Sequence, residues 1–313
     1  MYSEYQFKNY LSKVMTNIAK RVYFISMRCP QKAFLLIRYL SLSKKAVDLS
    51  DNVEGIEKHV PLFILFSCYY LEHSDLNGNR GVDQGFFYEK EKQLTLADWN
   101  RIFSESERMG AISGLLSGKE ALPHSDMIKS AIRHKRMIFT IFMEEELYED
   151  IWFEIFRKNF NLLPVISIPG NEAYTDAIKG SCFYEKRMLL MKKMQRYCMP
   201  FGISITVSKD NLCHSMDYAF LSEIYKLGCI AVYFVDDISS ERPSSDEMSA
   251  VGLDEYNYTL MDKLRLLRLQ YEDMLFIHFP NDINPALGCV AAGKESNVIL
   301  SHTAMIRYVI NDL

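Results

Sequence analysis

The segment PLFILFSCYYLEHSDLNGNRG, from Pro61 to Gly81, joins an unbroken apolar run to a polar loop. An apolar run that follows a proline and ends at turn-forming residues is typical of a strand in a parallel sheet, which is buried on both faces. The loop carries Cys68, Glu72 and His73, whose side chains can bind metal ions. Loops that follow strands face the active end of a parallel α/β barrel. The segment therefore raises the question whether this loop holds a metal cluster.

The chain has 313 residues, of which 49% are hydrophobic, and a formal net charge of -4. This sequence can bury a large core, in one α/β barrel or in two smaller domains, and we expect one main domain. The slight acidic balance offers no broad basic surface and argues against a nucleic-acid partner. No apolar run approaches the roughly 20 residues that cross a bilayer, and the charged N-terminus is unlike a signal peptide. We therefore expect a cytoplasmic protein without membrane contact.

Seven cysteines are dispersed along the chain, and no two of them form a C-x2-C pair. This arrangement predicts neither a disulfide framework nor a zinc site, so we expect most of the cysteines to be reduced, buried small side chains. Two basic clusters, Lys129–Arg136 and Lys186–Arg196, have the charge pattern of solvated helix faces.

Hydrophobic periodicity predicts two leading helices, Tyr5–Val22 and Gln31–Leu42. After His59, short apolar runs alternate with amphipathic segments, which is the signature of βα units around a parallel sheet. The expected strands are Leu62–Phe66, Ala111–Leu116, Met137–Phe142, Leu163–Ile168, Gly202–Val207, Ile230–Val235 and Met274–His278. The expected helices are Thr95–Met109, Ser125–His134, Glu145–Asn159, Phe183–Tyr197, His214–Leu227 and Asp254–Tyr271.

This pattern divides the chain into an N-terminal helical preface, residues 1–58, a partial barrel, residues 59–280, and a C-terminal extension, residues 281–313. Within the barrel, Asp236–Gly252 is polar and rich in serine, and we expect either a mobile surface loop or a lid after the sixth strand. The extension has the pattern of a loop followed by a short hairpin-like element.

Several segments, in order, resemble motifs of the radical S-adenosylmethionine (radical SAM) superfamily. They are HVPLFILFS (59–67), GLLSGKEALPHSD (114–126), VISIPGNEAYTDAIKGSCFYEKRMLLMKKM (165–194), MPFGISITVSKDNL (199–212) and FIHFPNDINPALGCVAAGK (276–294). The resemblance covers His59 to Lys294, and the ordered series is more specific than any one motif. It implies an α/β fold, a partial (β/α)6 TIM-like barrel of radical SAM type with N-terminal helices and a C-terminal extension.

The family's three cluster cysteines, spaced C-x3-C-x2-C, align here with Glu72, Leu76 and Asn79. In the family, three thiolates hold a [4Fe-4S] cluster, and SAM chelates the fourth iron. A carboxylate, an alkyl group and an amide do not replace three soft, anionic thiolates. A shifted register that begins at Cys68, with Glu72 and Asp75, supplies one thiolate only. We therefore expect no [4Fe-4S] cluster, no other metal and no catalytic residue in this loop.

The resemblance also places a vestigial SAM pocket, a possible site for SAM, at the ends of several strands. The matching positions are Gly118, Lys119, Glu120, Ser167, Ser204 and Thr206. Lys119 replaces a family glycine and either fills the pocket, supplies a charge to an anionic ligand, or points to solvent. The segment TDAIKG (175–180) fits a turn whose aspartate and glycine serve the backbone.

Three functions follow from these patterns. The first is a pseudoenzyme, a non-catalytic binding or regulatory partner of an active radical SAM relative or of a peptide or protein substrate in a modification or biosynthetic pathway. The second is an enzyme that keeps a SAM or small-molecule pocket at the barrel mouth and uses Glu120 or Asp176 as acid or base. The third is a radical SAM enzyme with atypical ligation, which would recruit cysteines such as Cys68 and Cys289.

Overall fold

The fold is an open α/β partial barrel built on one parallel sheet of eight strands, in the order β7-β6-β5-β4-β3-β2-β1-β8. The predicted fold class is therefore confirmed. The computed structural model describes residues 9–11, 13–18, 20–21, 63–67, 94–109, 111, 113–117, 125–143, 150–236, 249–279, 282 and 299–301.

All seven strand pairs are parallel. Neighbouring strands from β1 to β7 follow one another in sequence, so every carboxyl end lies at the same edge of the sheet. The strands are β1 (Phe63–Ser67), β2 (Ser113–Ser117), β3 (Ile138–Met143), β4 (Leu162–Ser167), β5 (Phe201–Val207), β6 (Cys229–Asp236), β7 (Leu275–Phe279) and β8 (Ile299–Ser301). Each predicted strand overlaps an observed one.

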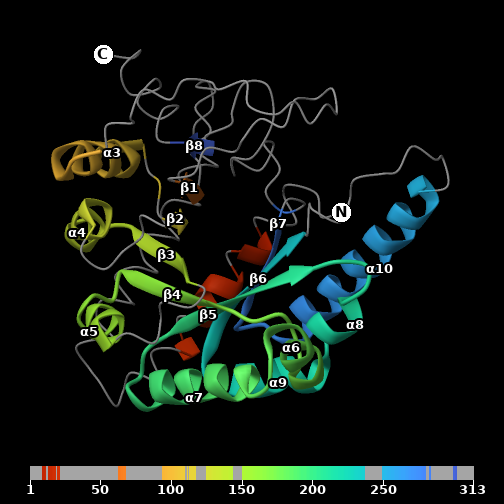
Figure 1. Ribbon diagram of the computed structural model, residues 1–313. Helices are drawn as coiled ribbons and strands as arrows, with labels where there is room; N and C mark the ends of the chain where they lie inside the picture. Colours follow the sequence, from red (N-terminus) through yellow and green to blue (C-terminus); the bar gives the residue numbers. More distant parts are fainter. Residues whose placement is uncertain are drawn as a thin grey trace, which may run out of the picture.

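Helices connect successive strands and surround the outer side of the curved sheet (Figure 1). They are α3 (Leu96–Met109), α4 (Asp126–Arg133), α5 (Asp150–Lys158), α6 (Glu172–Lys179), α7 (Phe183–Arg196), α8 (Leu212–Ser215), α9 (Tyr218–Lys226) and α10 (Ser249–Gln270). This alternation of strands and outer helices matches the βα units predicted from the sequence.

Two helix predictions were wrong at their boundaries. The expected helix His214–Leu227 is split into α8 and α9, because the Asp217 carboxylate accepts hydrogen bonds from the N–H groups of Ala219 and Phe220 and starts a new helix there. Helix α10 begins at Ser249 rather than Asp254, so the last part of the expected polar loop is helical.

Several other predictions lie wholly or partly outside the described residues. These are the helix Gln31–Leu42, the start of the helix Glu145–Asn159, residues 237–248 of the expected loop, most of the C-terminal extension, and the domain boundaries that depend on these segments. Of the extension, Asp282 and β8 are described, and β8 pairs in parallel with β1.

The strands from β2 to β7 are largely buried on both faces, which explains their continuous apolar sequences. On β5, Phe201, Ile203 and Ile205 belong to the outer cluster beneath the helices. Gly202, between them, faces inward, where an added Cβ would lie 3.1 Å from the carbonyl oxygen of Ala231 and 3.2 Å from a Val165 methyl group. The inner face therefore admits no side chain at this position without movement of its neighbours.

A helical segment near the N-terminus, residues 9–21, covers part of the inner face (Figure 1). Leu11, Val14 and Ile18 lie on one stripe of this segment and pack in the inner cluster, which also contains residues of β4, β6 and β7. The Tyr10 hydroxyl accepts a hydrogen bond of 2.9 Å from the N–H of Phe276 in β7. The segment thus adds its apolar side chains to the core on the inner face of the sheet.

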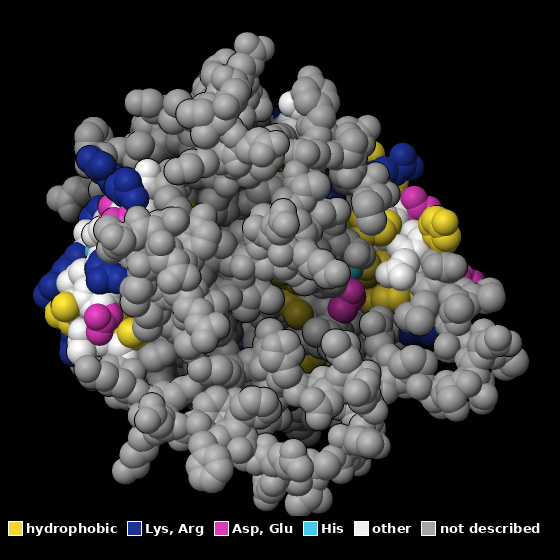
Figure 2. Space-filling view, turned by 90° about the horizontal axis from the view of Figure 1, so that it is seen from above, with side chains coloured by type: hydrophobic (Ala, Val, Ile, Leu, Met, Phe, Trp, Pro, Cys, Tyr) yellow, Lys and Arg dark blue, Asp and Glu magenta, His cyan; other side chains and the backbone are white. Residues whose placement is uncertain are grey.

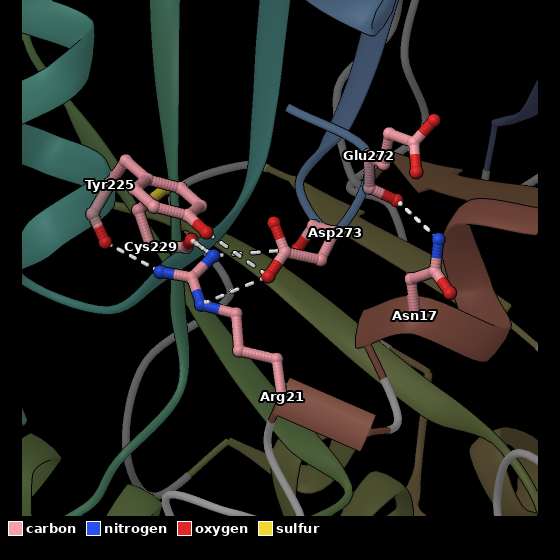
Figure 3. A network of polar contacts seen from close by, with 6 residues as sticks. All are labelled: Asn17, Arg21, Tyr225, Cys229, Glu272 and Asp273. Atoms are coloured by element: carbon pink, nitrogen blue, oxygen red, sulfur yellow. Dashed lines mark hydrogen bonds and ion pairs between the residues drawn. The ribbon is translucent and has the colours of Figure 1, made fainter. Parts of the chain in front are cut away.

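Arg21 fixes the end of this segment to the amino ends of β6 and β7 (Figure 3). Its guanidinium donates to the carbonyl oxygens of Tyr225, Cys229 and Asp273, and lies 3.9 Å above the centre of the Tyr225 ring. Nearby, Asn17 donates to the carbonyl oxygen of Glu272 at 3.2 Å. One cation therefore satisfies backbone acceptors from three separate elements.

The basic cluster Lys129–Arg136 is largely a solvated surface, as predicted. Lys129, Arg133, Lys135 and Arg136 are all exposed. Seen from above, Lys and Arg side chains gather along the left edge of the molecule, where α3 and α4 lie (Figure 2). These charges do not form part of the pocket described below.

The cysteine prediction was only partly right. Of the four described cysteines, only Cys229 is buried, whereas Cys182 and Cys213 are exposed. Burial raises the pKa of the Cys229 thiol to about 12, which keeps it protonated and unreactive. The two exposed cysteines lie at or near helix starts on the surface, where the apolar pattern of the sequence gives no guidance.

We expect Arg21→Ala to lower the free energy of unfolding by about 2 kcal/mol, because carbonyl groups from several elements lose a charged donor. Urea denaturation followed by circular dichroism measures this change. Lys13→Ala, on the same helical segment, removes an exposed ion pair with Glu272 and should cost less than about 0.5 kcal/mol. Equal effects of the two substitutions would contradict this role of Arg21.

Candidate functional site at the carboxyl ends of β4 and β5

A pocket of about 260 Å³ lies at the carboxyl ends of β4 and β5, next to α6 and α7. Its strand side is polar and includes Ser167, Thr206, Ser208 and Asn211. Ligands of open parallel sheets bind at this edge, beyond the carboxyl ends of the strands. The pocket therefore has the location expected of a binding site.

Strand alternation brings two of the predicted residues to this pocket. Ser167 ends β4 and lies directly beside Ser204 in the register of β4 and β5. Thr206 lies two residues further along β5 on the same face, and its side chain is exposed. Ser167 and Thr206 line the pocket, whereas Ser204 is not among its described lining residues.

Asn211 shapes the loop after β5. Its Oδ1 accepts a hydrogen bond of 2.8 Å from the N–H of Ser208, and its Nδ2 donates to the carbonyl oxygen of Thr206 at 2.7 Å. The side chain is buried, so these bonds replace the backbone contacts that a regular strand would make. Asn211 therefore holds the backbone on which the Thr206 and Ser208 hydroxyls stand.

The helix side of the pocket carries two cations, Lys179 at the end of α6 and Arg187 in α7. Arg187 is only 1% exposed, and its guanidinium carbon lies 4.6 Å from the centre of the Phe183 ring. The sequence had indicated that the cluster Lys186–Arg196 is a solvated face, and this prediction is wrong for Arg187. Arg187 is on the buried stripe of α7, whereas Lys186 is exposed.

The loop from β4 to α6 is held against α8. Asn171 caps α6 through a 3.2 Å bond from the N–H of Tyr174, and its Nδ2 donates to the Asp217 carboxylate at 3.1 Å. That bond from Asn171 is the main cause that lowers the pKa of Asp217. The Tyr174 ring stacks on His214 with centroids 5.1 Å apart and planes 9° apart. Tyr174, which lines the pocket, is therefore fixed in orientation.

The sequence predicted a turn at the segment TDAIKG (175–180), and this prediction was wrong. The segment forms the second half of α6, and Gly180 is the C-cap. Asp176 points to the start of the next helix, where its two carboxylate oxygens accept from the N–H groups of Cys182 at 3.0 Å and Tyr184 at 2.8 Å. Cys182 itself makes no side-chain cap bond. The Asp176 carboxylate therefore caps α7, which is a structural role.

The other predicted site residues lie outside the described residues. They are Gly118, Lys119 and Glu120 of the second-strand loop, Glu72, Leu76 and Asn79 of the cluster loop, and the cysteines Cys68 and Cys289. Within the described part of the chain, no three His, Cys, Asp or Glu side chains are grouped so as to hold a metal ion. No helix in that part is both long enough and apolar enough to span a bilayer.

Sequence reasoning missed Lys179, Arg187 and Asn211. Arg187 could have been found from its helical spacing, because Tyr184, Met188 and Met191 lie on the same buried stripe. The position of Lys179 depends on where α6 ends, and the position of Asn211 depends on where α8 begins. The local sequence reveals neither boundary.

No protein-family model and no curated protein sequence matches the chain significantly. Similar solved structures include Streptococcus suis SuiB bound to S-adenosylmethionine, with a TM-score of 0.46 and 17% identity over 80% of this chain and 56% of that one. SuiB bound to the precursor peptide SuiA gives a TM-score of 0.46 and 15% identity over 85% and 60%. The protein anSMEcpe with bound AdoMet gives 0.44 and 13% over 69% and 61%. The chain spans less than two thirds of each of these proteins.

We expect Asp176→Ala to destabilise the protein by about 1–2 kcal/mol, because the first turn of α7 loses a charged acceptor for two N–H groups. Thermal unfolding in the absence of ligand measures this change. Glu172→Ala, an exposed acid on the same helix, is the control and should have a smaller effect. An unchanged midpoint for Asp176→Ala would return this carboxylate to the candidates for acid–base chemistry.

Proposed function

We propose that this chain is a non-catalytic ligand-binding protein built on a radical-SAM-like partial barrel, and that the pocket between β4, β5, α6 and α7 is its ligand site. In this proposal the protein acts as a binding or regulatory partner in a modification or biosynthetic pathway. The positions that resemble the cluster motif hold Glu72, Leu76 and Asn79, which offer no thiolate.

The observation that carries the proposal is the chemistry of the pocket lining. The described lining residues offer hydroxyl, amide, phenol and cationic groups but no carboxylate, imidazole or thiol. Acid–base catalysis needs a positioned group that takes or gives a proton near neutral pH. Asp176, the described acid that the sequence suggested for this role, is bound to the backbone of α7. The described lining is therefore suited to binding rather than to proton transfer.

SAM is the first ligand to test. The sequence resemblance matches Ser167 and Thr206 to SAM-binding positions, and both residues line the pocket. An adenosyl ligand also suits the lining, which combines the aromatic rings of Tyr174 and Phe183 with hydroxyl groups.

Isothermal titration calorimetry with SAM and S-adenosylhomocysteine tests the site. We expect at least one of them to bind, and Thr206→Tyr to abolish the heat because the added ring fills the pocket. Lys209→Tyr adds the same ring at an exposed position outside the described lining and should leave binding unchanged. Binding that survives Thr206→Tyr would place the ligand elsewhere.

Anaerobic reconstitution with iron and sulfide tests the absence of catalysis. We expect no thiolate-to-iron charge-transfer absorbance and no 5′-deoxyadenosine after addition of SAM and a reductant, because the cluster loop offers no set of thiolates. Formation of 5′-deoxyadenosine that Cys68→Ala or Cys289→Ala removes would instead establish a radical SAM enzyme with atypical ligation.

A further inference from the structure

The two cations of the pocket are presented by one structural unit. Lys179 stands in the last turn of α6 and Arg187 in the second turn of α7, and Asp176 joins these helices by capping the start of α7. The fold therefore places both residues beside the pocket, and burial also restricts the side chain of Arg187, whereas Lys179 is exposed. Arg187 is buried at the pocket wall, so a ligand beside it meets a cation in a medium of lower dielectric constant than water.

The strand side of the pocket adds hydroxyl groups, which can also donate hydrogen bonds to an anion. The hydroxyl groups of Ser167, Thr206 and Ser208 belong to the lining, and the Asn211 side chain fixes the loop that carries two of them. Hydroxyl and guanidinium groups together are the usual partners of carboxylate and phosphate oxygens. No described lining residue is acidic, so none offsets an additional positive charge on a ligand.

On this basis, and given the proposed function, we propose that the pocket selects its ligand by charge. Arg187 and Lys179 bind an oxyanion of the ligand, a carboxylate or a phosphate, and the site disfavours a cationic centre such as the sulfonium of SAM. Among adenosyl ligands, the preferred class is therefore the neutral thioether that carries a carboxylate or a phosphate, and not the methyl donor, which adds a sulfonium charge.

Four probes separate these features in calorimetric titrations of the full chain. S-adenosylhomocysteine and SAM differ by one methyl group and one positive charge. Methylthioadenosine lacks the whole aminocarboxylate tail, including its ammonium group, and adenosine monophosphate carries a phosphate in place of the thioether tail. We expect S-adenosylhomocysteine to bind about tenfold more tightly than SAM, the size of effect that one charge produces at a partly buried site. Whichever of S-adenosylhomocysteine and adenosine monophosphate binds more tightly identifies the oxyanion that the site prefers. That probe should also bind more tightly than methylthioadenosine.

Charge variants assign the effect to its residues. Lys179→Gln should reduce the preference for S-adenosylhomocysteine over methylthioadenosine severalfold, whereas Lys186→Gln, an exposed lysine outside the described lining, should not. Arg187→Lys keeps the charge of the buried side chain and should keep the preference for oxyanions if the variant is folded by circular dichroism. Equal effects of the Lys179 and Lys186 variants would overturn the assignment to Lys179.

The outcomes distinguish this inference from the proposed function. Binding of none of the four probes would contradict both. Binding of SAM at least as tightly as S-adenosylhomocysteine, or of methylthioadenosine as tightly as the carboxylate and phosphate probes, would overturn the charge selection. In either of those cases the ligand-binding function would stand.

Discussion

Parallel pairing in sequence order is the constraint on which the rest of the structure depends. It places the ends of β4 and β5 side by side, with Ser167 opposite Ser204. It also obliges each connection to cross from one edge of the sheet to the other, so that α6 and α7 stand over the outer face and begin near the same edge. A pocket between strand ends and helix termini follows from this geometry without any specialised segment.

Within this frame, single polar side chains, buried in the case of Asn211 and half-buried in the others, determine the local backbone. Asp176, Asn211 and Arg21 each satisfy backbone groups that belong to another element or to an irregular loop. Such bonds add modest net stability, but removal of one partner leaves a buried group unsatisfied, which costs more than the bond itself contributes. Polar residues that sequence reasoning treats as candidates for chemistry can therefore be structural, and Asp176 is the clearest example here.

The strands could be predicted because burial on both faces leaves a purely local signal, a continuous apolar run. The site could be predicted only in part. Ser167 and Thr206 were predicted from their match to motifs at the strand ends of a resembling family. Arg187 lies in a helix whose other basic residues are exposed, and only its position relative to Tyr184 and Met191 distinguishes it. The break between α8 and α9 depends on Asp217, whose capping bonds compete with a continuous helix that the apolar pattern permits equally well.

In the proposed function, charge is also what separates binding from catalysis in this pocket. Reductive cleavage of a sulfonium requires an electron donor held against it, and the soft thiolates that would hold an iron cluster are missing from the matching loop positions. A wall of cations and hydroxyls favours oxyanions instead, and burial of Arg187 strengthens that preference because water screens it less. The proposed loss of the cluster is therefore physically compatible with a ligand pocket, because the described charges of the pocket belong to α6 and α7 and not to the cluster loop.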